Sequence, residues 1–211
     1  MVNVAKRYYI FIFLVSFGWT SSGLAIHSGI EPINDFNLNK YLGTWYEIAR
    51  IENSFEEGLT NVTATYSLRK DGKVKVVNKG YDIEDEEWDE ADGYAEFATK
   101  PHVAHLEVTF FWPFYADYVV FEIDPDYQYA FVTSDSNEYL WLLAKTPQVS
   151  QTVIERFMRV AREKNFKIEE LVFVPQEKYI QSKSTQFAKS EENSTKSLQV
   201  KDHKQEVGQD D

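Results

Sequence analysis

Histidine, serine and acidic side chains are the residues of this sequence whose types could do covalent or metal chemistry. His102 and His105 have the i, i+3 spacing of two metal ligands on one helical face. However, they follow Pro101 in a predicted loop-to-strand region, and no third ligand stands at motif spacing. No serine stands in the Gly-x-Ser-x-Gly order of a nucleophile elbow, and the absence of cysteine removes a thiol nucleophile and a thiolate zinc site. We therefore predict no catalytic residue, no metal site and no cofactor.

The acidic run at 85–92 is a second candidate for metal binding. Its carboxylates belong to Asp85, Glu86, Glu87, Asp89, Glu90 and Asp92. They lack the Asp-x-Asp-x-Asp-Gly order of a calcium loop, so we interpret 82–92 as an exposed loop at the solvated end of a hairpin. A cavity enzyme stays an alternative interpretation, which turnover lost on changing His105 to Ala would support.

Charge and aromatic content narrow the class of protein. The 211-residue chain has a formal net charge of −12, and a surface of that sign repels nucleic-acid phosphates and anionic headgroups. We therefore expect no nucleic-acid partner. Its 13 Tyr, 15 Phe and 5 Trp favour pleated surfaces, which indicates an all-β fold in one domain of ordinary size.

The two ends of the chain differ in composition from its middle. Lys6 and Arg7 precede an apolar run at 8–19 and small residues up to Ala25, the order of a secretory signal peptide at 1–25. The run is shorter than the ~20 residues of a membrane-spanning helix. Because no cysteine is available for lipid attachment, we expect an exported protein in the periplasm, at the periphery of the outer membrane, or outside the cell. A segment at 26–36 leads into the folded domain, and the polar tail at 176–211 is predicted to be disordered.

Runs that alternate between apolar and polar residues recur through the middle of the chain, separated by turn residues. The predicted strands are 45–51, 62–68, 74–80, 93–98, 106–111, 118–123, 129–133 and 139–144. Eight strands can close a barrel wide enough for one small ligand. The period then changes to that of a helix, capped by Ser150 and ending near Asn165, before a short strand at 171–174. The sequence therefore predicts an eight-stranded antiparallel up-and-down barrel at 37–175 with one C-terminal α-helix packed outside.

A family resemblance appears at the first predicted strand. Gly43-Thr44-Trp45-Tyr46 resembles the lipocalin G-x-W-Y signature, and together with 62–68 it is similar to the bacterial lipocalin and apolipoprotein D branch. The resemblance continues through 78–81, 111–115 and 139–141 to Val174. It implies a lipocalin barrel that binds and transports or stores a fatty acid, a lysophospholipid or a similar small hydrophobic ligand. The residues of its structural signature are Gly43, Trp45, Glu47 and Lys145.

The sequence departs from this family in two places. Bacterial members carry a lipoprotein cysteine that anchors them to the outer membrane, and this sequence has none. Lipocalins also place an arginine over the signature tryptophan, where this chain has Lys145. A lysine keeps the charge and part of the cation–π contact with Trp45, but it loses the planar stack and the forked donors. We expect a somewhat weaker barrel floor and the same fold.

Alternation along the predicted strands assigns the residues that face the inside of the barrel. Most are apolar, and each methylene of an acyl chain buried among them gains ~0.8 kcal/mol. The predicted cavity residues are Ala49, Ile51, Val62, Ala64, Tyr66, Val74, Val76, Ala95, Phe97, Leu106, Val108, Phe110, Trp141 and Leu143. The alternative is that these side chains simply fill the barrel; the family resemblance favours an open cavity.

Glu47 lies two residues after Trp45 in the same predicted strand, so its side chain should also point into the barrel. Burying a carboxylate without a partner destabilises the folded protein. Asn78 and the hydroxyl of Tyr118 are candidate partners. Two interpretations stay open: a structural hydrogen-bond network at the barrel floor, or contact with the headgroup of a ligand.

Five aromatic residues gather in and around one predicted connection between strands. They are Phe110, Phe111, Trp112, Phe114 and Tyr115. Exposed apolar surface of this extent is typical of a rim that contacts lipid, with transient membrane contact through Phe111, Trp112 and Phe114. The alternative is that the cluster folds over and packs against the barrel. A third interpretation is a protein-interaction module that uses the segment 110–115. The sequence does not predict the oligomeric state.

Overall fold

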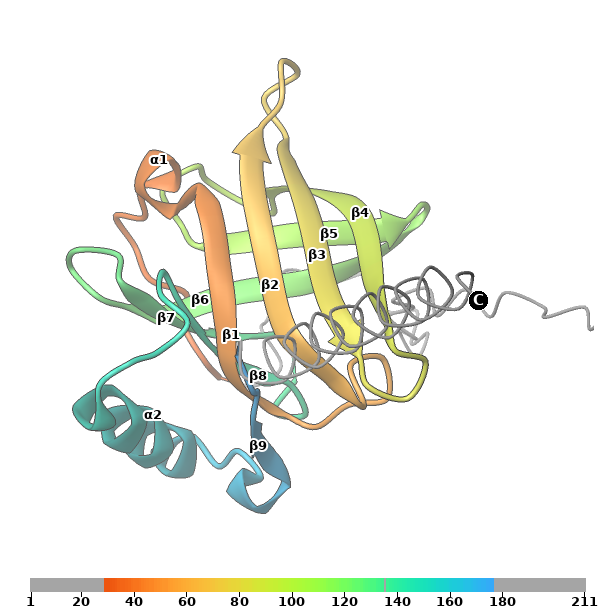
Figure 1. The fold of residues 1–211 in the computed structure, drawn as a ribbon. Coiled ribbons are helices and arrows are strands. Elements are labelled where there is room, and N and C mark those ends of the chain that lie inside the picture. The colour runs from red at the N-terminus through yellow and green to blue at the C-terminus, as the bar shows by residue number, and fades with distance from the viewer. Residues whose placement is uncertain (1–28, 135, 177–211) are drawn as a thin grey trace, which may run out of the picture. The chain divides into compact units, whose positions relative to one another are not determined.

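The computed structural model describes residues 29–134 and 136–176. The predicted signal peptide at 1–25 lies outside the described residues, and so does the predicted disordered tail at 176–211 apart from Gln176. Within the described ranges, the elements run from the short helix α1 (Leu38–Tyr41) to strand β9 (Leu171–Phe173) (Figure 1).

Eight antiparallel strands form a closed barrel (Figure 1), which confirms the predicted fold class. The strands are β1 (Gly43–Ile51), β2 (Leu59–Leu68), β3 (Val74–Asp82), β4 (Glu87–Phe97), β5 (His105–Phe111), β6 (Phe114–Ile123), β7 (Tyr129–Thr133) and β8 (Leu140–Ala144). Each pairs with the next along the chain, and β1 pairs with both β2 and β8, which closes the ring. Short β9 pairs with the far end of β1. Consecutive strands therefore neighbour one another throughout, as an up-and-down order requires.

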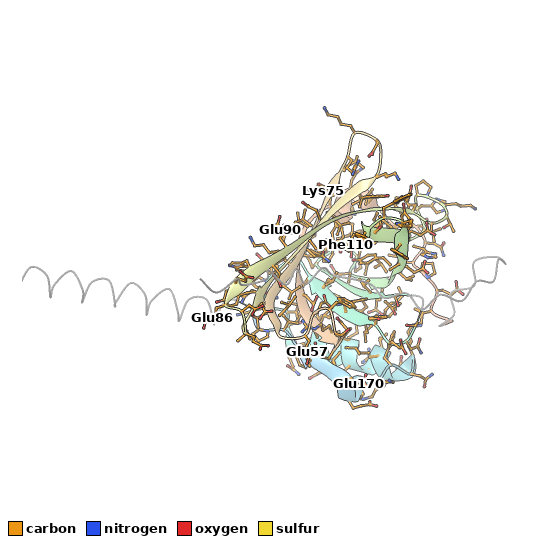
Figure 2. All side chains as sticks on the ribbon, turned by 90° about the vertical axis from the view of Figure 1, so that its right-hand side faces the viewer. Glu57, Lys75, Glu86, Glu90, Phe110 and Glu170 are labelled. Atoms are coloured by element: carbon orange, nitrogen blue, oxygen red, sulfur yellow. The ribbon has the colours of Figure 1, made fainter. Side chains whose placement is uncertain are left out.

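The hairpin of β3 and β4 extends further than the sequence pattern predicts. Because β4 begins at Glu87, the prediction of a loop through Asp92 is wrong, although the acidic run does lie at the end of a hairpin. Cross-strand charge pairs explain the difference: the Lys75 ammonium lies 2.9 Å from a carboxylate oxygen of Asp92. Opposite charges on neighbouring strands offset the low strand propensity of acidic residues. Figure 2 shows Lys75 and Glu86 at opposite ends of this hairpin.

Helix α2 (Gln151–Glu163) packs outside the barrel, as predicted (Figure 1). Its buried face consists of Phe157 and Ala161, each 1 % exposed. Asn165 ends the helix with a φ of 60°, a left-handed conformation that asparagine tolerates better than most residues. Ser150 holds the N-cap position with extended backbone, but its hydroxyl makes no capping hydrogen bond. In the part of the chain that the structure describes, no helix has the length and apolar character needed to cross a bilayer.

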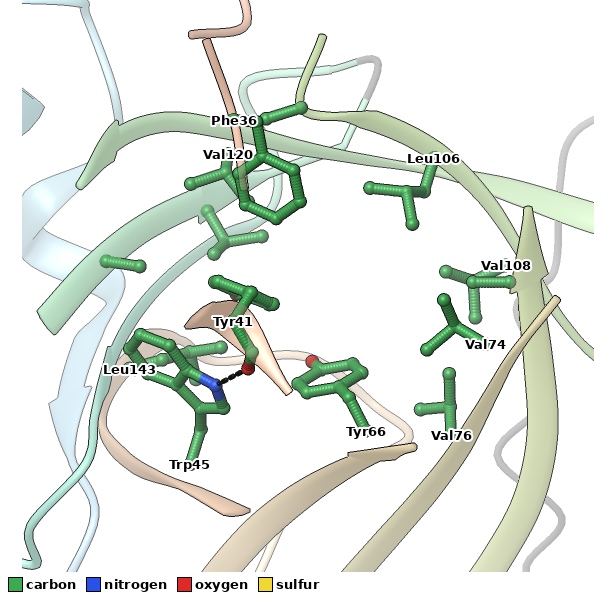
Figure 3. Close-up of a cluster of buried hydrophobic side chains, with 14 of the residues drawn as sticks. Phe36, Tyr41, Trp45, Tyr66, Val74, Val76, Leu106, Val108, Val120 and Leu143 are labelled. Carbon is green, nitrogen blue, oxygen red and sulfur yellow. Dashed lines mark hydrogen bonds between the residues drawn. The ribbon is translucent and has the colours of Figure 1, made fainter. Parts of the chain in front are cut away.

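The apolar side chains form two large clusters, one on each side of the barrel wall. The outer cluster joins α2 to β1, β7 and β8 through residues such as Phe131, Leu142 and Phe157. In the inner cluster, side chains from different strands point toward one another, among them Trp45, Tyr66 and Leu106 (Figure 3). The inner cluster is continuous with the candidate site, since Tyr66 and Leu143 of the cluster also line the pocket.

Candidate functional site

Trp45 belongs to the inner cluster and lies near the start of β1, which follows helix α1 (Figure 1); we call this end of the barrel the floor. Its side chain is fully buried, and its indole N–H donates to the Tyr41 carbonyl at 2.6 Å (Figure 3). The Lys145 ammonium lies 4.3 Å from the centroid of the Trp45 ring and donates to the Leu42 carbonyl at 2.7 Å. Burial lowers the pKa of Lys145. The predicted cation–π contact is therefore confirmed, and a weaker floor stays a prediction.

Three tyrosine hydroxyls meet above this floor. The hydroxyl of Tyr118 lies 2.6 Å from that of Tyr41 and 2.9 Å from that of Tyr66. Burial raises the pKa of all three phenols above the ordinary value of 10.0, so they are neutral near pH 7. Each phenol has one proton to donate, and the chain of hydrogen bonds holds the three rings in place across the barrel.

A pocket lies between the tyrosine hydroxyls and the connection of β1 to β2. Its lining residues are Glu47, Phe55, Glu56, Val62, Thr63, Ala64, Tyr66, Asn78, Tyr118, Trp141 and Leu143. The cavity volume is about 70 Å³, below the ~300–1,000 Å³ of pockets that enclose a drug-sized ligand. In this conformation the pocket therefore has room for only a small part of a ligand of that size.

A β-bulge in β1 changes which of its residues face the pocket. The pairing of β1 with β8 shifts register between Glu47 and Ala49. Beyond the bulge, Ala49 and Ile51 join the outer cluster with α2, and Arg50 turns toward Glu47. The prediction that Ala49 and Ile51 line the cavity is therefore wrong, because the period of two breaks wherever a strand carries an extra residue.

Arg50 is the partner of Glu47, in place of the two predicted partners, Asn78 and Tyr118. The Arg50 guanidinium donates to a Glu47 carboxylate oxygen at 3.0 Å, and both residues are buried. It also donates to the Glu52 carboxylate at 2.9 Å and to the Glu56 carbonyl at 2.6 Å. Sequence reasoning missed Arg50 because strict alternation along β1 predicts that its side chain faces the outside of the barrel. A lone arginine in an apolar strand was the signal that could have found it.

Glu56 brings a second buried carboxylate to the pocket. It accepts hydrogen bonds from the Trp141 indole N–H at 3.1 Å and from the Asn53 amide at 2.6 Å. Burial raises the pKa of Glu47 well above its ordinary value; repulsion from Glu56 adds to this effect and Arg50 opposes it. We call Glu47, Arg50 and Glu56 the Glu–Arg–Glu cluster. Glu56 and Phe55 were missed because they belong to a connection without periodicity.

The remaining predicted cavity residues divide between the pocket and the packed interior. Those that line the pocket are Val62, Ala64, Tyr66, Trp141 and Leu143. Those that belong to the inner cluster or pack against it without lining the pocket are Val74, Val76, Ala95, Phe97, Leu106, Val108 and Phe110, whereas Ala64, Tyr66, Trp141 and Leu143 do both. The inward positions therefore form one continuous apolar interior, and the pocket occupies one part of it. Contact of any of these residues with a ligand stays a prediction.

The aromatic segment forms the tip of the hairpin of β5 and β6, with Trp112 and Pro113 as the connection. Phe111 is 57 % exposed, Trp112 73 % and Phe114 46 %. In contrast, Phe110 packs against the inner cluster, and the Tyr115 hydroxyl lies 2.8 Å from that of Tyr94. The tip therefore presents three aromatic side chains to solvent, and only its flanks fold back.

His105 contributes to the packing of β5 against β6. It is 4 % exposed, and its Nε2 forms a hydrogen bond with the Asp117 carboxylate. Across residues 29–134 and 136–176, no three histidine, aspartate or glutamate side chains gather as candidate metal ligands.

Comparisons with known proteins bear on both sequence and fold. Residues 36–176 match the family model of the lipocalin-like domain. The chain is 46 % identical over 155 residues to the outer membrane lipoprotein Blc of Vibrio cholerae, covering 73 % of this chain and 91 % of that protein. It is 32 % identical over 170 residues to apolipoprotein D of Bos taurus, covering 74 % and 87 %. Insecticyanin of Manduca sexta superposes with a TM-score of 0.58 at 17 % identity, covering 71 % and 85 %, which shows a shared fold alone.

Proposed function

The chain belongs to the lipocalin family, and from this premise we propose that it binds and transports or stores a single-chain lipid, such as a fatty acid or lysophospholipid, without turnover. The observation that carries the proposal is the apolar wall of the pocket. Val62, Ala64 and Leu143 line it together with aromatic rings, and each methylene buried there gains ~0.8 kcal/mol.

Two measurements test the proposal. Mass spectrometry of a solvent extract of the purified protein should detect a bound lipid, and a neutral fluorescent lipid should bind the delipidated protein saturably. Ala64→Trp fills the pocket and should weaken that binding more than tenfold, which corresponds to about 1.4 kcal/mol. Ser67→Trp, at an exposed position of the same strand, is the matched control. No saturable binding by the wild type, or equal binding by both variants, would refute the proposal.

We also propose export to the periplasm or the outside of the cell. The charged and apolar order of residues 1–25 supports export, and relatives such as the Vibrio protein bear the name of outer membrane lipoproteins. Cell fractionation with periplasmic and cytoplasmic marker proteins tests the location. Recovery of the protein with the cytoplasmic marker would contradict it.

The exposed aromatic tip supports a second proposed role, transient contact with a membrane. Phe111, Trp112 and Phe114 present apolar surface at one end of the barrel, where lipid would enter or leave. Trp112→Ser should reduce co-sedimentation with phosphatidylcholine vesicles, whereas Leu68→Ser, an exposed position beside the β2–β3 connection at the other end of the barrel, should not. Equal sedimentation of both variants with the wild type would refute the membrane role, and a protein complex lost on Trp112→Ser would favour a protein partner.

A further inference from the structure

We infer that the pocket selects amphiphiles whose polar group donates a hydrogen bond, such as an ammonium, alcohol or amide, over amphiphiles that end in a free carboxylate. The inference rests on the proposed carrier function. It distinguishes between single-chain lipids by their polar group. It follows from the charges and unpaired polar atoms in the wall of the pocket.

The pocket wall contains two carboxylates and no cation. Glu47 and Glu56 line it, and none of the lining residues is lysine, arginine or histidine. Both glutamates are 4 % exposed, so water screens the negative charge of this pair poorly. A ligand carboxylate placed here meets that charge, and the cation in contact with it, Arg50, is already bound to Glu47.

Arg50 does not supply the missing cation, because its N–H groups are already engaged. Its Nη1 donates to Glu47, its Nη2 to Glu52 and to the Glu56 carbonyl, and its Nε to Glu52. At least four of its five donors are thus used within the protein. A fatty-acid carboxylate could recruit Arg50 only by breaking the Glu–Arg–Glu cluster.

An unpaired acceptor lies in the same wall. The Asn78 side-chain oxygen is buried and has no hydrogen-bond partner, and Asn78 lines the pocket. A buried acceptor without a partner carries a desolvation penalty that a donor on the ligand removes. A ligand N–H or O–H would satisfy this oxygen, whereas a carboxylate offers no donor.

Aromatic rings surround these acceptors. Trp141, Phe55 and Tyr66 line the pocket beside the two glutamates, and the Trp141 N–H is directed at Glu56. Ring faces next to carboxylates attract an ammonium group through cation–π and ionic interactions together. Among donor headgroups, we therefore expect an ammonium to bind at least as well as an alcohol.

The experiment compares three ligands with the same alkyl chain. Dodecylamine, dodecanol and dodecanoate compete for the delipidated protein against a neutral fluorescent probe, at about pH 8, where the amine is cationic and the acid anionic. We expect the amine and the alcohol to displace the probe at concentrations at least tenfold lower than dodecanoate. We define the preference ratio as the displacing concentration of dodecanoate divided by that of dodecylamine. Glu47→Gln and Glu56→Gln, which keep the hydrogen-bonding shape, should each lower this ratio at least threefold.

A matched variant separates the pocket from the net charge of the protein. Glu84→Gln removes one negative charge at an exposed turn and should leave the ratio unchanged. Equal or tighter binding of dodecanoate by the wild type would overturn the inference and leave the carrier function standing. A ratio that falls as much with Glu84→Gln as with Glu56→Gln would also overturn it, since net charge would then explain the preference. Failure of all three ligands to displace the probe would overturn the carrier function itself.

Discussion

Replacing Arg50 tests the physical role of the Glu–Arg–Glu cluster. Arg50→Met keeps much of the side-chain volume but removes the guanidinium that donates to Glu47 at 3.0 Å and to the Glu56 carbonyl at 2.6 Å. Glu47 would then be a buried carboxylate without its cation. Removing one partner of a buried ion pair costs about 3–5 kcal/mol, a large part of the ~5–15 kcal/mol that stabilises a typical domain.

Urea unfolding followed by tryptophan fluorescence measures this cost, and a double variant identifies its cause. We expect Glu47→Leu combined with Arg50→Met to recover most of the lost free energy of unfolding, because replacing both partners with apolar side chains is often neutral. A single variant that loses less than ~1 kcal/mol, or a double variant no more stable than Arg50→Met, would refute the reasoning.

The pH dependence of the same variant gives an independent check. Burial already holds the folded-state pKa of Glu47 above its ordinary value of 4.5, and loss of Arg50 removes the charge that opposes this rise. A raised carboxyl pKa favours the protonated folded state, so the stability it contributes is complete below the unfolded pKa and is lost as pH rises through the folded pKa. The penalty of Arg50→Met should therefore be smallest below pH 4.5 and grow toward neutral pH; a penalty independent of pH would contradict the assignment.

Three further predictions concern stability, each measured by urea unfolding. Lys145→Met should cost about 1–3 kcal/mol, because it removes the cation over Trp45 and the hydrogen bonds to two carbonyls; Lys145→Arg should restore most of this, and equal stability of both variants would contradict a role for the charge. Gln176→Ala should cost about 1–2 kcal/mol, because the Gln176 amide donates to carbonyls of both β1 and β2; an unchanged unfolding midpoint would argue against this bridge. Asn165→Ala should cost about 1 kcal/mol while Asn165→Gly costs less, because the φ of 60° strains a Cβ; the reverse order would exclude backbone strain as the cause.

The fold could be predicted from the sequence because its signals are local. Alternation with a period of two marks each strand whether or not its partner is known, and the bounds predicted for β7 are those observed. The G-x-W-Y segment likewise placed Trp45 at the floor, with Lys145 above it. For half of the predicted cavity residues, the sequence could not distinguish pocket lining from packed interior. Alternation along a strand identifies the residues that face inward, but it does not show how far neighbouring side chains fill the space between them.

The sequence alone determined the order of the strands, the helix that follows them and the apolar inner face, because each follows from short-range periodicity. The lack of a thiol follows from residue types alone. Only the tertiary structure decided the chemistry of the pocket. The register of β1 against β8 places a bulge after Glu47, and beyond it Ala49 and Ile51 join the outer cluster while Arg50 pairs with Glu47. A connection between strands then brings Glu56 against Trp141. Both events depend on contacts between segments far apart in the chain, which no local pattern encodes.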